Sequence, residues 1–101
     1  MQREALHFVY PGHYEEVEIC TVNYYTLRFL EEWAGLVRSI KPEKVMDRRV
    51  MGEIEVSHLA QPHWKEVKEG DVVVKFKDGS LQVYNAGMAA AYISRKRGHH
   101  G

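Results

Sequence analysis

The sequence predicts a single α+β domain in which an antiparallel, twisted sheet of four or five strands carries two helices on one face. Short runs in which apolar and polar residues alternate, typical of strands, recur along the chain. Two further stretches have apolar residues at helical spacing. The 101 residues suffice for one hydrophobic core and leave no room for a second domain. We therefore expect one domain over residues 1–98, in the order β-β-α-β-β-β-α, and a flexible tail at 99–101.

The chain begins with a predicted hairpin. Side chains alternate between two faces in residues 5–10 and again in residues 16–22, as strands require. Pro11 and Gly12 interrupt the first run, and both residue types favour turns. We expect residues 11–14 to connect two paired strands.

A long helix is predicted next, over residues 24–40. Asn23 suits its N-cap, because the short side-chain oxygen can accept a backbone N–H of the first turn, and Pro42 supplies the stop. The apolar arc covers roughly half of the helix circumference, which is wider than the stripe of about 100° that a single core-facing side needs. One sheet cannot easily cover all of this arc.

A third strand is predicted over residues 48–58, where the alternation is clean. Gly52 inside it indicates a bulge or the close passage of a helix, because glycine has no side chain to pack. Residues 59–70 contain Pro62 and show no periodicity, so they are expected to form a connecting loop.

Residues 71–84 carry the strongest local signal, a second hairpin. The Asp-Gly pair at 78–79 suits a two-residue type I′ turn, in which both central residues take positive φ. Such a turn pairs Val74 with Val83 and places every apolar pair on one face of the sheet. The sheet is therefore expected to have one solvated face.

The last predicted element is a second helix from Ala86 to about Arg97. Asn85 suits its N-cap, and Gly98 suits the position after the last turn. Its basic end suits the negative pole of the helix dipole.

Charge and composition argue against several classes of protein. Lys and Arg number 14 and Asp and Glu also 14, whereas a nucleic-acid-binding domain usually has a basic surplus. The single cysteine, Cys20, makes an intramolecular disulfide impossible, which argues against a secreted, disulfide-stapled domain. No apolar run is long enough to span a membrane, and the first residues lack a signal-peptide layout. We expect a cytoplasmic protein without a membrane partner, and the Glu-rich composition with few Asn, Gln and Cys favours thermostability.

The cysteine and the histidines are the candidates for catalysis or metal binding. Cys20 could act as a nucleophile if His7 and Glu18 lay beside it. His58 and His63 could meet one of the two histidines near the N-terminus at a metal ion. The chain has no HExxH and no paired CxxC motif, and an inert thiol and structural histidines explain these residues better. We expect no cofactor, no metal and no catalytic residue.

Glu53 and Glu55 are two carboxylates on the predicted solvated face. Two carboxylates facing one cleft are what a glycosidase-like acid–base pair requires. The same face is expected to carry Lys75 and Lys77, and a ladder of opposite charges explains the two glutamates without catalysis.

One alternative function is the binding of single-stranded nucleic acid. An open sheet that displays an aromatic residue and lysines, followed by a basic end, has the outline of an RNA-binding platform. The chain lacks the Lys/Arg-Gly-Phe type of core motif, and glutamates on the same face would repel phosphates. The residues that would bind are Lys75, Lys77, Tyr84, Arg95, Lys96 and Arg97.

The apolar arc of the helix over residues 24–40 is too wide for one sheet to cover. Either part of it forms an interface, or the second helix and residues 59–70 fold over the excess. Large aromatic side chains supply rigid contact area and dominate the energy of many interfaces. We interpret the chain as a non-catalytic protein-interaction module, an adaptor, regulator or inhibitor, that forms a homodimer and can also bind another protein. A small Cys/His hydrolase is a further alternative. The predicted interface residues are Tyr25, Phe29, Trp33, Leu36, Ile40 and Trp64.

Overall fold

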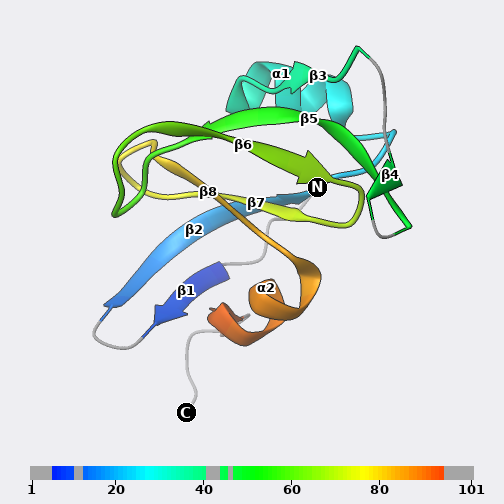
Figure 1. Ribbon diagram of the computed structural model, residues 1–101. Helices are drawn as coiled ribbons and strands as arrows, with labels where there is room; N and C mark the ends of the chain where they lie inside the picture. The colour runs from blue at the N-terminus through cyan, green and yellow to red at the C-terminus, as the bar shows by residue number, and fades with distance from the viewer. Residues whose placement is uncertain (1–5, 11–12, 41–43, 46, 95–101) are drawn as a thin grey trace.

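The computed structural model describes residues 6–10, 13–40, 44–45 and 47–94 (Figure 1). It has the predicted α+β composition, with two helices and antiparallel strands. The expected turn at Pro11 and Gly12, the stop at Pro42, the basic cluster from Arg95 to Arg97 and the tail at 99–101 lie outside the described residues.

The first sheet has five strands in the order β8-β7-β2-β1-β9. The expected first hairpin is confirmed, because β1 and β2 pair antiparallel from the partners Leu6 and Val17 to Tyr10 and His13. The strands of this sheet are β1 (Leu6–Tyr10), β2 (His13–Thr21), β7 (Val72–Lys75), β8 (Leu81–Tyr84) and β9 (Ile93–Ser94).

The second sheet is built around β5 (Arg48–Val56), which pairs with β3 (Val37–Arg38), β4 (Lys44–Val45) and β6 (His63–Lys68). The strand expected over residues 48–58 is thus present. The strands form two sheets and not the single sheet of the prediction, and the predicted element order is matched only roughly, because β3, β4, β6 and β9 are additional. The expected loop over residues 59–70 contains β6. Most of β6 is exposed and only Val67 is fully buried, so its sequence lacks the apolar alternation that marks a half-buried strand.

The first helix, α1 (Leu27–Ala34), is much shorter than the predicted helix over residues 24–40. Gly35 adopts the left-handed conformation with φ 69°, and the N–H of Leu36 donates to the C=O of Leu30. A glycine in the left-handed conformation commonly ends a helix, and here it turns the chain into β3. The helix therefore ends well before Pro42, which was expected to stop it.

The N-cap position of α1 is Thr26, so Asn23 caps the turn that precedes the helix and not the helix itself. Its side-chain Oδ1 accepts hydrogen bonds from the N–H groups of Tyr25 and Thr26, at 2.8 and 3.1 Å. The second helix, α2 (Ala86–Tyr92), begins as predicted at Asn85, whose Oδ1 accepts from the N–H of Met88. It ends earlier than predicted, because the chain then pairs with β1 as β9.

The two sheets and the two helices form layers (Figure 1). One core lies between the sheets and includes Val73 and Val83 of the first sheet, Ile54 of the second and Leu30 of α1. Another core lies on the other side of the first sheet and includes Val74 and the α2 residue Ala89. The helices therefore pack on opposite faces of the first sheet, not on one face as predicted.

Strand β7 is buried on both faces, which contradicts the expected solvated face. Val72, Val73 and Val74 are all buried, with Val73 and Val74 in different cores. The strand pairing also differs by one residue from the predicted register, since Val83 pairs with Val73 and not with Val74.

The register differs because the turn is longer than predicted. The N–H of Gly79 donates to the C=O of Phe76, and the N–H of Phe76 donates to the C=O of Ser80. Gly79 alone takes positive φ, at 88°, which is the pattern of a type I turn followed by a bulge. One extra loop residue shifts all pairs beyond it and reverses which side chains face which core.

The irregularity expected at Gly52 is confirmed as a bulge, whereas the expected passage of a helix is not found there. The register between β5 and β6 shifts between Val50 and Gly52. On its other edge Gly52 pairs with Arg38 of β3, so the neighbouring backbone that passes close to it belongs to a strand and not to a helix.

Candidate functional site

An aromatic surface is formed by Phe29 and Trp33 of α1 and by Tyr25 in the turn that precedes the helix. Tyr25 is 97% exposed and Phe29 is 48% exposed, although both are large apolar side chains. The rings of Phe29 and Trp33 stack, with 5.3 Å between their centroids and 24° between their planes. Exposed aromatic side chains of this kind are rare on a surface that contacts only water.

Trp33 is held in place by residues of the first sheet. The Lys75 Nζ atom lies 4.7 Å from the centroid of the Trp33 ring and donates to the Trp33 C=O at 2.6 Å. The Trp33 Nε1–H donates to the Glu18 carboxylate at 3.4 Å. Because these contacts restrict the ring before any partner arrives, less conformational entropy is lost when the surface binds.

Two charged residues flank the aromatic surface on the same helix. Arg28 and Glu32 are both exposed and are spaced four residues apart, so they lie one turn from each other beside Phe29. The surface of α1 therefore combines stacked aromatic rings with one positive and one negative charge.

The other predicted interface residues do not join this surface as one helical face. Leu36 is 5% exposed and belongs to the core between the sheets, so its placement in an interface is wrong. Ile40 is 95% exposed but follows β3, outside the helix. Trp64 is 52% exposed and lies on β6. The early end of α1 at Gly35 separates these residues from the aromatic surface.

Trp64 belongs to an acidic surface on the second sheet. Glu55 pairs with Trp64, and Glu53 pairs with Glu66, so like charges stand directly opposite across β5 and β6. The expected ladder with Lys75 and Lys77 is absent here, because β7 belongs to the other sheet.

Lys75 and Tyr84, two described residues of the predicted nucleic-acid platform, do not share a face. Lys75 is opposite Leu81 and contacts Trp33 of α1, whereas Tyr84 packs in the core on the α2 side. The Tyr84 ring contacts the edge of Tyr92, with 5.6 Å between the centroids. Lys77 is exposed in the turn of the second hairpin. The side chains are separated because the sheet has a core on each face.

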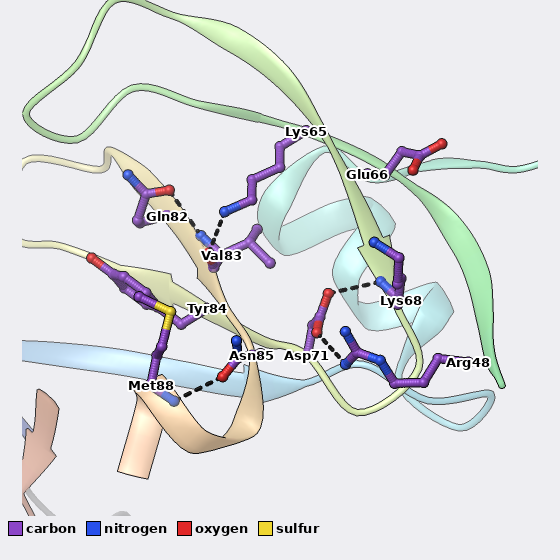
Figure 2. Close-up of a pocket in the computed structure, with 10 residues that line it drawn as sticks. All are labelled: Arg48, Lys65, Glu66, Lys68, Asp71, Gln82, Val83, Tyr84, Asn85 and Met88. Atoms are coloured by element: carbon purple, nitrogen blue, oxygen red, sulfur yellow. Dashed lines mark hydrogen bonds and ion pairs between the residues drawn. The ribbon is translucent and has the colours of Figure 1, made fainter. Parts of the chain in front are cut away.

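Sequence reasoning missed a groove between β6 and β8, which has a cavity volume of about 400 Å³ (Figure 2). Arg48 donates to the buried Asp71 carboxylate at 2.7 Å, and Asp71 also accepts from the N–H of Lys68 at 2.9 Å. Lys65 and Tyr84 line the groove as well. The groove can be found from the sequence only if β6 is recognised as a strand. The many charged residues of β6 hide the alternating pattern by which a strand is recognised.

His58 and His63, which were considered for metal binding, have hydrogen-bond partners within the chain. His58 is buried, and its Nδ1 lies 2.9 Å from the Ser80 Oγ. His63 is exposed, and its Nδ1 lies 2.9 Å from the C=O of Gln61. No group of three or more His, Cys, Asp and Glu side chains suited to a metal ion occurs in the described parts of the chain.

Ser80 lies between His58 and an acidic residue, but the order of contacts is not that of a catalytic triad. The Ser80 hydroxyl donates to the Asp78 carboxylate at 2.5 Å, so the serine and not the histidine contacts the acid. Hydrogen bonds from the Ser80 side chain and N–H hold the pKa of the Asp78 carboxyl below its ordinary value. This arrangement stabilises the turn of the second hairpin.

Cys20 is half-buried on β2, and burial raises the pKa of its thiol. Glu18 lies two residues away but bonds to Trp33, and the backbone of β1 pairs His7 with Glu16. These positions do not form the arrangement of base and carboxylate that would activate a thiol.

We expect Cys20 to react slowly. At about pH 8, alkylation by iodoacetamide should be several-fold slower in the folded protein than in protein unfolded with guanidinium, because the thiolate is the nucleophile and a raised pKa lowers its fraction. Mass spectrometry of samples quenched over time measures both rates. Equal or faster alkylation of the folded protein would restore Cys20 as a candidate nucleophile.

A comparison with known protein families, curated proteins and solved structures finds no match for this chain. Among the described residues, neither helix has the length and apolar character needed to cross a membrane.

Proposed function

We propose that this chain is a protein-interaction module that self-associates through the aromatic surface of α1. The observation that carries this proposal is the exposed Phe29 ring, which stacks on the partly buried Trp33 that Lys75 and Glu18 hold in place. Rigid aromatic side chains that remain exposed in the folded chain provide apolar area that association removes from water.

A second copy is the partner that the charges favour. In a two-fold interface the same surface is used by both subunits, so each residue pair occurs twice. If two α1 helices meet in opposite directions at Phe29, Arg28 of each subunit lies near Glu32 of the other. The exposed pair of opposite charges beside the aromatic rings makes the surface self-complementary.

The dimer is expected to be weak. Three aromatic and two charged side chains are few beside the roughly 20 to 30 residues that each partner contributes to a standard interface. We therefore expect a dissociation constant on the order of 10 μM, which corresponds to about 7 kcal/mol.

Sedimentation equilibrium over a series of protein concentrations tests this proposal. Phe29→Ser should give a monomer at concentrations where the unmodified chain is dimeric. Met88→Ser, at another exposed apolar residue on α2, is the matched control and should leave the dimer unchanged.

A charge exchange tests the two-fold geometry separately from the apolar contact. Arg28→Glu and Glu32→Arg should each weaken the dimer, because like charges would then face each other across the axis. The chain with both substitutions should recover most of the affinity. A monomer at all concentrations would contradict the proposal, and so would a dimer whose dissociation constant Phe29→Ser leaves unchanged.

A further inference from the structure

The lining of the groove between β6 and β8 includes three cationic side chains and a carboxylate that is already paired. Arg48 comes from β5, and Lys65 and Lys68 come from β6. The Asp71 carboxylate is buried and accepts from the Arg48 guanidinium at 2.7 Å and from the N–H of Lys68 at 2.9 Å. The Glu66 carboxylate points away from the groove in Figure 2. The groove therefore presents a surplus of positive charge to a ligand.

Contacts within the chain orient the hydrogen-bond donors of the groove. A guanidinium carries five N–H donors and an ammonium three. The ion pair occupies one donor of Arg48, and the bond from the Lys65 Nζ to the Val83 C=O, at 2.9 Å, occupies one donor of Lys65. The Asn85 Oδ1 accepts from the N–H of Met88 at 2.8 Å (Figure 2), so it is the amide NH₂ group of Asn85 that remains for a ligand in the groove.

Main-chain groups of β8 are already bonded on this side of the first sheet. The N–H groups of Ser57 and His58 donate to the C=O of Leu81, and the Lys65 Nζ donates to that of Val83. The segment after β5 thus occupies this edge, and recognition in the groove depends on side chains. The cavity volume of about 400 Å³ lies in the range of sites for small molecules.

A second cavity, of about 240 Å³, continues the groove. It shares Gln82, Tyr84 and Met88 with the first cavity, and its lining also includes Leu59. Leu59 is 73% exposed and Met88 is 42% exposed, so both have apolar area that a ligand can remove from water. An anion in the first cavity can therefore carry an organic group that extends into the second.

We propose that this groove binds a small organic molecule that carries a phosphate group. The phosphate faces Arg48, Lys65 and Asn85, and the organic group lies against Leu59 and Met88. A phosphate monoester has nearly two negative charges at pH 7 and three acceptor oxygens, which match the charge and the separate donors of the groove. Charge-assisted hydrogen bonds of this kind are stronger than neutral ones.

Two-dimensional amide NMR of the full chain, titrated with phenyl phosphate, tests the proposal. The amide signals of residues 65–68 and 83–85 should shift, and the binding should weaken with salt. Phenyl sulfate has the same shape but a single negative charge, so it should bind about fivefold more weakly or worse. Inorganic phosphate lacks the organic group and should bind about tenfold more weakly. Phenol, which lacks the anion, should not bind.

Side-chain variants locate the two parts of the ligand. Lys65→Gln and Lys68→Gln should each weaken binding of phenyl phosphate about fivefold, because each removes a charge of the groove. Lys77→Gln, the same change in the exposed turn, should leave the affinity unchanged. Met88→Ser should weaken binding of phenyl phosphate but not of inorganic phosphate. Urea midpoints show that each variant is folded.

Equal binding of phenyl sulfate and phenyl phosphate would overturn the selection of a phosphate, and equal binding of inorganic phosphate would overturn the role of the second cavity. No signal shift at millimolar phenyl phosphate, or unchanged binding in both Lys65→Gln and Lys68→Gln, would overturn the site itself.

Two larger probes test whether the ligand is a small molecule. A phosphotyrosine heptapeptide and a thymidine decanucleotide should bind no more tightly than phenyl phosphate. Binding of either one at the same signals that is tenfold tighter or more would overturn the assignment to a small molecule. Phe29→Ser should bind phenyl phosphate normally, so that loss of self-association and loss of ligand binding are separate results.

Discussion

Replacing Gly52 by alanine is expected to lower the free energy of unfolding by about 3 kcal/mol or more, the upper range for forcing an extra carbon into packed structure. A Cβ atom at this position would lie 2.3 Å from the C=O oxygen of Val37. The obstacle is backbone that is itself hydrogen-bonded in the second sheet, so it cannot rotate away as a side chain would. Either β3 separates from β5 or the bulge is lost.

Urea unfolding followed by circular dichroism measures this effect. Gly87→Ala is the matched control, because a Cβ there would lie 3.4 Å from the Asn85 Oδ1, an ordinary contact. Alanine also favours helix over glycine, so stability should be unchanged or slightly raised. Equal urea midpoints for Gly52→Ala and Gly87→Ala would contradict the close approach of β3 to β5.

Leu30→Ala should cost about 2 to 5 kcal/mol, the range for truncating a large aliphatic side chain in a core. Leu30 is fully buried and brings α1 into contact with both sheets through the core between them. Its loss leaves a cavity that α1 cannot fill, because the helix is held at its end by the Gly35 turn.

Phe29→Ala on the next residue of the same helix is the control. Phe29 is about half-exposed, so its truncation should cost less than about 1 kcal/mol. Urea midpoints measured on dilute monomer separate the two variants. A large loss for Phe29→Ala with a small loss for Leu30→Ala would mean that α1 presents the opposite face to the core.

Local sequence signals identified those parts of the fold that depend on neighbouring residues. The first hairpin, the irregularity at Gly52 and the cap by Asn85 are all local, and each is present. The end of α1 was also encoded locally, in Gly35, but the apolar residues beyond it continued the helical spacing and concealed it. These residues are apolar because they enter a core or a strand, not because the helix continues.

Long-range packing accounts for the remaining differences. Val72–Val74 is buried on both faces because the second sheet covers one of them. The three consecutive valines are the local sign of this, since strands buried on both faces have continuous apolar runs, but they do not say which element provides the cover. The exposed aromatic residues Tyr25 and Phe29 were recognisable from the excess apolar arc, whereas Leu36 was not distinguishable from them. The groove could not be predicted, because it requires two edge strands from different sheets to lie side by side.

The double burial of β7 ties the two halves of the molecule into one cooperative unit. Val73 and Val74 are adjacent, yet each belongs to a different core, so β7 cannot leave one core and stay in the other. Opening the layer that contains α2 would expose the back of the strand on which the other core rests. Partial opening is therefore penalised twice, which favours unfolding of the whole chain over the release of single layers.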